Sequence, residues 1–156
     1  MRGVKVQNTH NLKRLGETLV ELVGFLNSPQ RDDALLREAG VEIDRALFPI
    51  LVALGARGVL GIAEIADLVG RDYTTVSRQV TKLASLRFVA RTAGSGDRRQ
   101  RTMQLTAQGQ AIVRAITAAR LRLLSRALSA WSDADIGRLA DLNRRFAQSL
   151  GAFAGS

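Results

Sequence analysis

The chain has 156 residues, a formal net charge of +9 and no cysteine. Its length and its 46% hydrophobic residues suit a single globular domain, residues 1–156, with a core of its own. The absence of cysteine excludes disulfides and thiolate metal ligands, and the one histidine, His10, cannot by itself supply a zinc site or a His-dependent catalytic triad. We therefore expect no metal site, no cofactor and no enzymatic activity.

The longest uninterrupted apolar run, residues 46–54, has nine residues and is far too short to cross a bilayer. The first ten residues, MRGVKVQNTH, lack the apolar stretch of a signal peptide. These two features predict a protein that stays in the cytoplasm and has no membrane partner.

The positive charge is concentrated in one part of the chain. Residues 1–70 carry eight basic and nine acidic side chains, whereas residues 71–106 carry eight basic and two acidic ones, a net charge of +6. Residues 107–156 carry seven basic and three acidic side chains. A focused basic region is typical of a protein that binds the phosphate backbone of a nucleic acid. A surface that merely keeps the protein soluble is the alternative explanation.

An amphipathic helix is predicted over residues 9–27, where leucines recur at three- and four-residue spacings. Pro29 ends it, because proline disfavours helix at the residue before it. A short second helix is expected over residues 32–39, since Gly40 follows it. The apolar stripe of the first helix consists of Leu12, Leu15, Leu19, Leu22, Val23 and Leu26.

A third helix is predicted over roughly residues 44–55, with apolar residues at helical spacing. Asp44 is placed to cap its start. Pro49 would then remove one hydrogen bond from the helix, so the alternative is a helix that starts later or is kinked.

Residues 61–86 have the pattern of a helix-turn-helix. A short helix over residues 61–69 is followed by the turn GRD at residues 70–72, and Asp72 is placed to cap a second helix over residues 73–86. One side of this second helix is apolar, and the other has hydroxyl, amide and basic groups without any acid, which suits base edges in a major groove. The alternative is an ordinary solvent-exposed helix side. The candidate DNA-binding residues are Thr74, Thr75, Ser77, Arg78, Gln79 and Lys82.

Two short strands are predicted next, near residues 88–92 and 100–105, and the second alternates apolar and polar residues. The segment GSGD lies between them, so residues 88–105 are expected to form a β-hairpin, the wing of a winged helix. Its tip carries four charged side chains, which are either a solvated tip with a local ion pair or arginines meant for a polyanion. They are Asp97, Arg98, Arg99 and Arg101.

The C-terminal part is predicted to form two helices. The first starts at Thr106 and runs to about Ala130 with apolar stripes on two sides, which indicates burial on two sides. Ser132 and Asp135 have the spacing of a capping box for a final helix, and Trp131 before it is expected to pack between two helices. The apolar stripe of the final helix consists of Ile136, Leu139, Leu142, Phe146 and Leu150.

The expected fold class is mainly α with a small β-hairpin wing. Residues 44–106 are expected to form a winged helix-turn-helix DNA-binding lobe, flanked by helices in residues 9–40 and 107–156. These flanking helices carry more apolar surface than the small lobe needs for its own core. We therefore expect them to form the interface of a homodimer.

The stretch 60–110 resembles the MarR family (multiple antibiotic resistance regulators) of bacterial transcription regulators. Three motifs carry the resemblance: AEIADLVGRDYTTVSRQVTKL in the helix-turn-helix, DRR followed by MQLT in the wing, and LTAQGQ at the start of the long helix. The resemblance implies that Arg99 enters a minor groove and that Asp97 orients it. It also implies phosphate contacts for Arg98 and Arg101, and contacts to bases and backbone for the six candidate residues of the helix-turn-helix.

The resemblance further implies a homodimeric regulator, a repressor of nearby genes, that binds a pseudo-palindromic operator in double-stranded DNA. The half-sites would lie about one turn, roughly 34 Å, apart. A small aromatic acid or lipophilic ligand, bound between the dimer helices and the winged helix, would release the DNA. The alternative is a winged helix that serves as a protein-interaction or non-specific nucleic-acid-binding module without ligand control. An RNA reader is disfavoured because aromatic residues make up only 4% of the chain.

Overall fold

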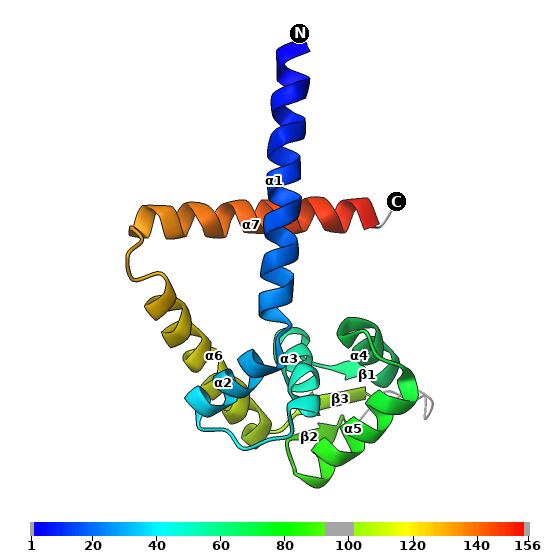
Figure 1. Cartoon of the computed structure of the whole chain (residues 1–156). Coiled ribbons are helices and arrows are strands. Elements are labelled where there is room, and N and C mark those ends of the chain that lie inside the picture. The colour runs from blue at the N-terminus through cyan, green and yellow to red at the C-terminus, as the bar shows by residue number, and fades with distance from the viewer. Residues whose placement is uncertain (1, 93–101, 155–156) are drawn as a thin grey trace. The chain divides into compact units, whose positions relative to one another are not determined.

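The computed structural model describes residues 2–92 and 102–154. The chain divides into two compact units, Met1–Ala119 and Arg120–Ser156. Helices make up most of the described residues, and the strands form one small antiparallel sheet (Figure 1). The predicted fold class, mainly α with a small β component, is confirmed.

The first two helices are longer than predicted. Helix α1 spans Arg2–Leu26, because the leucine stripe marks only its apolar side and nothing before that stripe interrupts the backbone. Helix α2 spans Pro29–Ala39 and has proline at its first position, where a helix needs no N–H donor. Gly40 ends α2 with a φ of 65°, in the left-handed region that glycine adopts without strain.

The third predicted helix starts late, as the proline suggested. Asp44 caps a 3-10 turn, η1 (Arg45–Leu47), by accepting a hydrogen bond of 2.9 Å from the Ala46 N–H. Helix α3 follows and spans Phe48–Arg57, with Pro49 in its first turn, where the missing N–H costs little.

Helices α4 (Ile62–Val69) and α5 (Tyr73–Ser85) form the predicted helix-turn-helix. Gly70 ends α4 with a φ of 66°, and Asp72 caps α5. Helix α5 is followed by Arg87, a non-glycine residue with a φ of 61°. The Phe88 N–H then bonds back to the Leu83 carbonyl at 3.0 Å, which closes the last turn of the helix.

The sheet has the strand order β1-β3-β2, and both pairings are antiparallel. Strands β2 (Val89–Arg91) and β3 (Thr102–Leu105) match the described parts of the predicted hairpin. Strand β1 (Leu60–Gly61) was not predicted, because two residues are too few to show an alternating pattern. It places Leu60 opposite Met103, and both side chains are buried.

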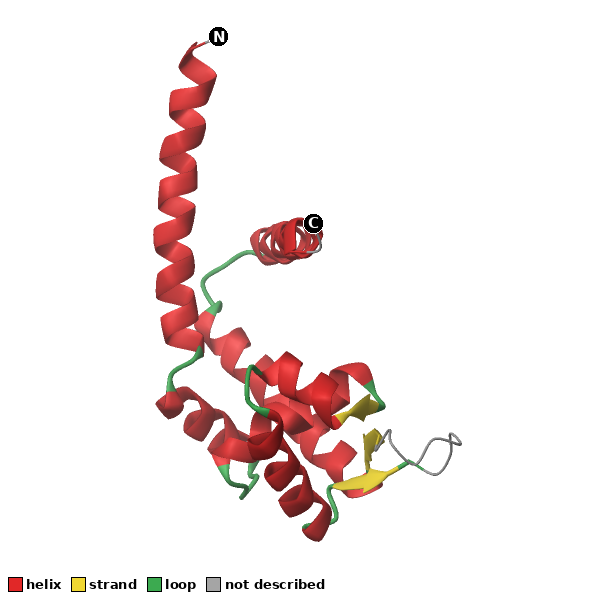
Figure 2. Ribbon diagram, turned by 90° about the vertical axis from the view of Figure 1, so that its right-hand side faces the viewer, coloured by secondary structure: helices red, strands yellow, loops and turns green. Residues whose placement is uncertain are grey.

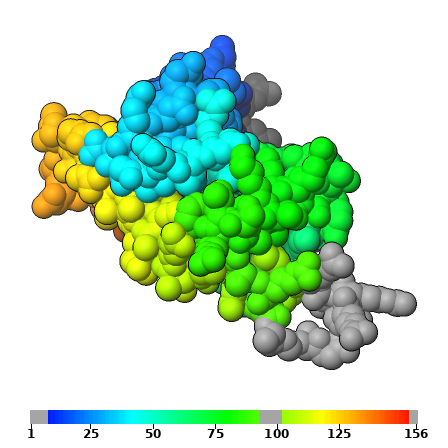
Figure 3. All heavy atoms as spheres, turned by 90° about the horizontal axis from the view of Figure 1, so that it is seen from below, coloured from blue at the N-terminus to red at the C-terminus, as the bar shows by residue number. Residues whose placement is uncertain are grey.

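One hydrophobic core holds α3, α4, α5 and the sheet together. Figure 2 shows the strands (yellow) beside helices (red) of this part of the chain. A second cluster joins α2, α3 and the first part of α6 through Leu36, Phe48 and Ile116. Figure 3 shows the residues of α2 (cyan) next to those of α6 (yellow) on one face of the molecule. The main core consists of Leu47, Ile50, Leu51, Leu54, Leu60, Ile62, Ile65, Ala66, Val76, Val80, Leu83, Val89 and Met103.

Helix α6 (Ala107–Ala127) starts in close contact with the end of α5. Thr106 precedes it, accepting a hydrogen bond of 3.1 Å from the Gly109 N–H and donating one of 2.6 Å to the Arg87 carbonyl. A Cβ at Gly109 would overlap the Phe88 carbonyl oxygen, so only glycine allows this approach. Further along the helix, Leu121 and Leu124 are exposed in the single chain.

The final helix, α7, spans Asp133–Ala154 and has the predicted capping box. Ser132 Oγ accepts a hydrogen bond of 3.1 Å from the Asp135 N–H and donates one of 2.8 Å to the Asp135 carboxylate. The apolar stripe of α7 is poorly covered in the single chain, since Leu142 and Leu150 are more than half exposed. Trp131 is also half-exposed.

Candidate nucleic-acid interface

The start of α5 is held by a charged cap. Asp72 accepts hydrogen bonds from the Thr75 N–H at 2.8 Å and from the Thr75 hydroxyl at 2.7 Å. The pKa of Asp72 is therefore lowered, first by the Thr75 hydroxyl and then by the Thr75 backbone N–H. Sequence reasoning predicted Asp72 as the cap and Thr75 as a DNA contact, and the structure pairs the two.

The two sides of α5 differ as predicted. Val76, Val80 and Leu83 are buried in the core, so the polar side of the helix is turned away from it. Of the six candidate residues, Thr74, Arg78 and Lys82 are exposed, and Thr75, Ser77 and Gln79 are half-buried. The structure thus places Thr74, Arg78 and Lys82 on the outer side of α5 and the other three nearer its border with the core.

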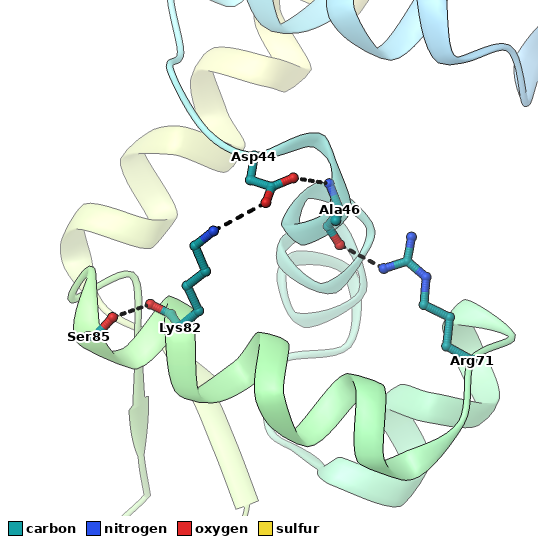
Figure 4. Close-up of polar contacts among 5 residues, drawn as sticks. All are labelled: Asp44, Ala46, Arg71, Lys82 and Ser85. Atoms are coloured by element: carbon teal, nitrogen blue, oxygen red, sulfur yellow. Dashed lines mark hydrogen bonds and ion pairs between the residues drawn. The ribbon is translucent and has the colours of Figure 1, made fainter.

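Lys82 has an intramolecular partner on η1. Its Nζ lies 3.2 Å from Oδ2 of Asp44, which also caps η1 (Figure 4). The pKa of Asp44 is lowered, first by the Ala46 N–H and then by the hydrogen bond from Lys82. Because both side chains of this pair are about half exposed, the pair contributes little stability and does not prevent Lys82 from contacting a phosphate.

Arg71, in the turn before α5, makes two contacts that sequence reasoning missed. Its Nη1 donates a hydrogen bond of 2.7 Å to the Ala46 carbonyl and one of 3.0 Å to Oε1 of Gln79 (Figure 4 draws the first). The sequence marks Arg71 only as a turn residue. No local spacing signals a contact between residues 25 positions apart.

The base of the wing is described, and its tip is not. Strands β2 and β3 pair up to Thr92, whose N–H bonds to the Thr102 carbonyl at 3.1 Å, and the two threonine hydroxyls share a hydrogen bond. The predicted tip residues, Asp97, Arg98, Arg99 and Arg101, lie outside the described residues.

The segment that contains α5, residues 71–92, is basic. Arg78, Lys82, Arg87 and Arg91 are all exposed, and Asp72 is the one acidic residue between positions 71 and 92. Across residues 2–92 and 102–154, no three or more His, Asp or Glu side chains come together as metal ligands would. In the same ranges no helix is both long and apolar enough to cross a membrane.

A helix-turn-helix packed on a third helix, α3, and followed at once by an antiparallel strand pair defines a winged helix-turn-helix protein. Solved structures with the same fold include a MarR family protein from Bacillus stearothermophilus. It is 22% identical, with 92% of this chain and 97% of that chain covered, at a TM-score of 0.77. A MarR family regulator from Neisseria meningitidis is 20% identical, with 93% and 96% covered, at a TM-score of 0.57.

NadR, solved in complex with 4-hydroxyphenylacetate, is 19% identical, with 85% of this chain and 92% of that chain covered, at a TM-score of 0.62. A family model described as HVO_A0114 matches residues 48–108. A comparison with curated proteins finds no significant match. The chain therefore has the winged-helix fold of the MarR family, and the resemblance inferred from the sequence is confirmed at the level of the fold. Two further proteins with this fold are described as transcription regulators.

Proposed function

We propose that this protein is a DNA-binding transcription regulator that places α5 in the major groove of double-stranded DNA. The observation that carries the proposal is the outer side of α5, which presents hydroxyl, amide and basic groups and no acid. The helix is capped at its start by Asp72 and packed against the core along its other side. A rigid helix with this chemistry can read base edges while its basic residues neutralise phosphates.

A protein-interaction module is the second candidate, and the charge distribution argues against it. A helix side that docks on a protein needs apolar anchors, whereas the outer side of α5 offers none between Thr74 and Lys82. A reader of single-stranded RNA would need exposed aromatic platforms. Tyr73 is the one exposed aromatic residue on α5.

The wing belongs to the same proposal on the strength of the sequence. Arg99 enters the adjacent minor groove, Asp97 orients it, and Arg98 and Arg101 contact phosphates. This assignment rests on the resemblance of the DRR and MQLT motifs to the MarR-family wing. The paired strands β2 and β3, which lead into and out of the tip, support it.

The functional unit of this proposal is a homodimer. The stripe on α1 is exposed in the single chain, with Leu12 59% and Leu26 66% exposed, and the stripe on α7 leaves Leu142 53% exposed. Long helices with uncovered apolar stripes gain stability by pairing with a second copy. A two-fold dimer would bind a pseudo-palindromic operator and repress nearby genes from it, with half-sites roughly 34 Å apart.

Control by a small ligand completes the proposal. An open hollow of about 390 Å³ lies in the first unit between the loop after α2, Phe88 and the first turns of α6. Its lining is mostly apolar and includes Glu42 but no lysine or arginine, which suits a neutral lipophilic compound better than an aromatic acid. A ligand would release DNA only if it binds better to a conformation that DNA does not select.

The test is a titration of a labelled duplex, taken from DNA upstream of the gene, at several salt concentrations. We expect the logarithm of the binding constant to fall linearly with the logarithm of the salt concentration. Arg78→Ala should weaken binding and reduce the slope by about 1 if Arg78 contacts a phosphate. Arg114→Ala, which removes the same charge from an exposed position on α6, is the control. Absence of binding, or a slope near zero, would refute the proposal.

A further inference from the structure

Arg71 connects three parts of the helix-turn-helix lobe. Its own backbone is fixed, because the Arg71 N–H bonds to the Ala66 carbonyl at the end of α4 (3.0 Å). One side-chain nitrogen, Nη1, reaches the Ala46 carbonyl of η1 at 2.7 Å and the Gln79 side chain of α5 at 3.0 Å. Both N–H groups of that nitrogen are thereby used.

The contact with Arg71 determines which way the Gln79 amide is turned. A guanidinium group can only donate hydrogen bonds, so the amide must offer its oxygen, Oε1, to Arg71. The amide nitrogen, which carries two N–H groups, is then the part of the side chain left to donate to another molecule. A glutamine without such a partner can use oxygen and nitrogen together to bind adenine, which offers one donor and one acceptor.

The amide is held before any partner arrives. Gln79 is half-buried at the border between the core side and the outer side of α5, and Arg71 is half-buried beside it. A side chain that is already oriented loses less conformational entropy on binding and discriminates more sharply between partners.

We propose that Arg71 sets the base preference of α5 by holding the side-chain oxygen of Gln79. A bidentate contact with adenine needs both ends of the amide to face the base, so with Oε1 turned toward Arg71, Gln79 reads base edges through its amide nitrogen. At the position it contacts, α5 then prefers guanine or thymine, whose major-groove edges present acceptors without a donor, over adenine. Arg71 is a positioning residue, and this inference rests on the proposed DNA-binding function.

The experiment enriches a randomised duplex DNA library on the full-length protein and sequences the bound fraction. Gln79→Ala identifies the contacted position as the one where the base preference of the wild type is lost. Arg71→Ala should raise the frequency of adenine relative to guanine and thymine at that same position by about fivefold or more, because the amide can now turn both of its ends toward the base.

Gln79→Glu tests the inference without removing the contact between Arg71 and residue 79. Glutamate keeps an oxygen for Arg71 but has no N–H to donate, so the fold is retained while the preference for guanine or thymine is lost. Cytosine, whose edge presents a donor, should gain at the same position. This variant carries the test if Arg71→Ala does not fold.

Asp44→Ala is the structural control. It removes the ion pair of 3.2 Å between Lys82 of α5 and the residue that caps η1, and leaves the contact between Arg71 and Gln79 in place. Base frequencies at the Gln79 position should not change in this variant, whereas a general loosening of α5 would change them as Arg71→Ala does.

The outcomes distinguish a failure of this inference from a failure of the proposed DNA-binding function. A wild-type protein that enriches a motif, with the same base frequencies in Arg71→Ala and Gln79→Glu, would overturn the role of Arg71 and leave the regulator intact. Equal changes in Asp44→Ala and Arg71→Ala would also overturn it. A wild-type protein that enriches no sequence and binds duplex without salt dependence would refute the proposed function, and this inference with it.

Discussion

Two aspartates, Asp72 and Asp44, hold the starts of α5 and η1 by accepting backbone hydrogen bonds. In both, the carboxylate is stabilised in the folded protein, so its pKa lies below the unfolded value of about 3.9. A carboxylate whose pKa is lowered in the folded state stabilises the protein at pH values above the unfolded pKa. That stabilisation is lost as the pH falls through the folded pKa.

Replacing Asp72 with alanine should therefore lower the melting temperature by a few degrees at pH 7. The difference from the wild type should shrink as the pH falls below about 4, where Asp72 of the unfolded chain begins to bind a proton, and should disappear below the folded-state pKa. Thermal unfolding followed by circular dichroism between pH 7 and pH 3 measures this. Asp67→Ala, which removes the same charge from the exposed side of α4, is the control. A difference between Asp72→Ala and the wild type that stays constant over this pH range would exclude a charged cap.

Arg99 is the second prediction at the residue scale. Arg99→Ala should weaken specific DNA binding by roughly 1–3 kcal/mol, because it removes one groove contact of the wing. The melting temperature and the oligomeric state should stay unchanged. The titration proposed for the wild type measures the affinity, and an unchanged affinity would show that the wing assignment is wrong.

At the scale of elements, the contact between the start of α6 and the end of α5 depends on the absence of one side chain. Gly109→Ala would push a Cβ into the Phe88 carbonyl, a backbone atom that cannot rotate away, and should destabilise the protein by about 1–3 kcal/mol. Gly137→Ala on α7 is the matched control, since a Cβ there meets no atom within 4 Å. It should instead stabilise its helix by about 0.5–1 kcal/mol. Urea unfolding of both variants measures the change in the free energy of unfolding, which should be negative for Gly109→Ala and positive for Gly137→Ala.

At the scale of the whole molecule, the proposed dimer predicts that the apolar stripe of α7 is covered by a second copy. Leu142→Glu should shift the protein toward a monomer and weaken binding to a palindromic operator more than binding to a single half-site. Gln148→Glu adds the same charge on the opposite side of α7 and should leave the dimer intact. Sedimentation or light scattering over a range of concentrations measures this, and a monomeric wild type would contradict it.

Much of the secondary structure could be predicted from the sequence, because its signals are local. The cap of α5 at Asp72, the glycine after α2 and the capping box at Ser132 each involve residues within a few positions of one another. Helical spacing likewise separated the buried side of α5 from its outer side, since position along a helix determines direction. The six candidate residues on α5 were found in this way, and their contacts with DNA remain a prediction.

What the sequence by itself determined is therefore the local structure: where helices begin and end, which side of each is apolar, and that α5 is basic and free of acids. Only the tertiary structure decided the long-range contacts. Strand β1 pairs with β3, Asp44 meets Lys82 across 38 positions, and Arg71 meets Ala46 across 25. Such contacts form because packing of the hydrophobic core brings distant segments together, and no short-range pattern records which polar groups then meet. The orientation of Gln79 depends on one of these contacts, so the base preference proposed for α5 could be derived only from the fold.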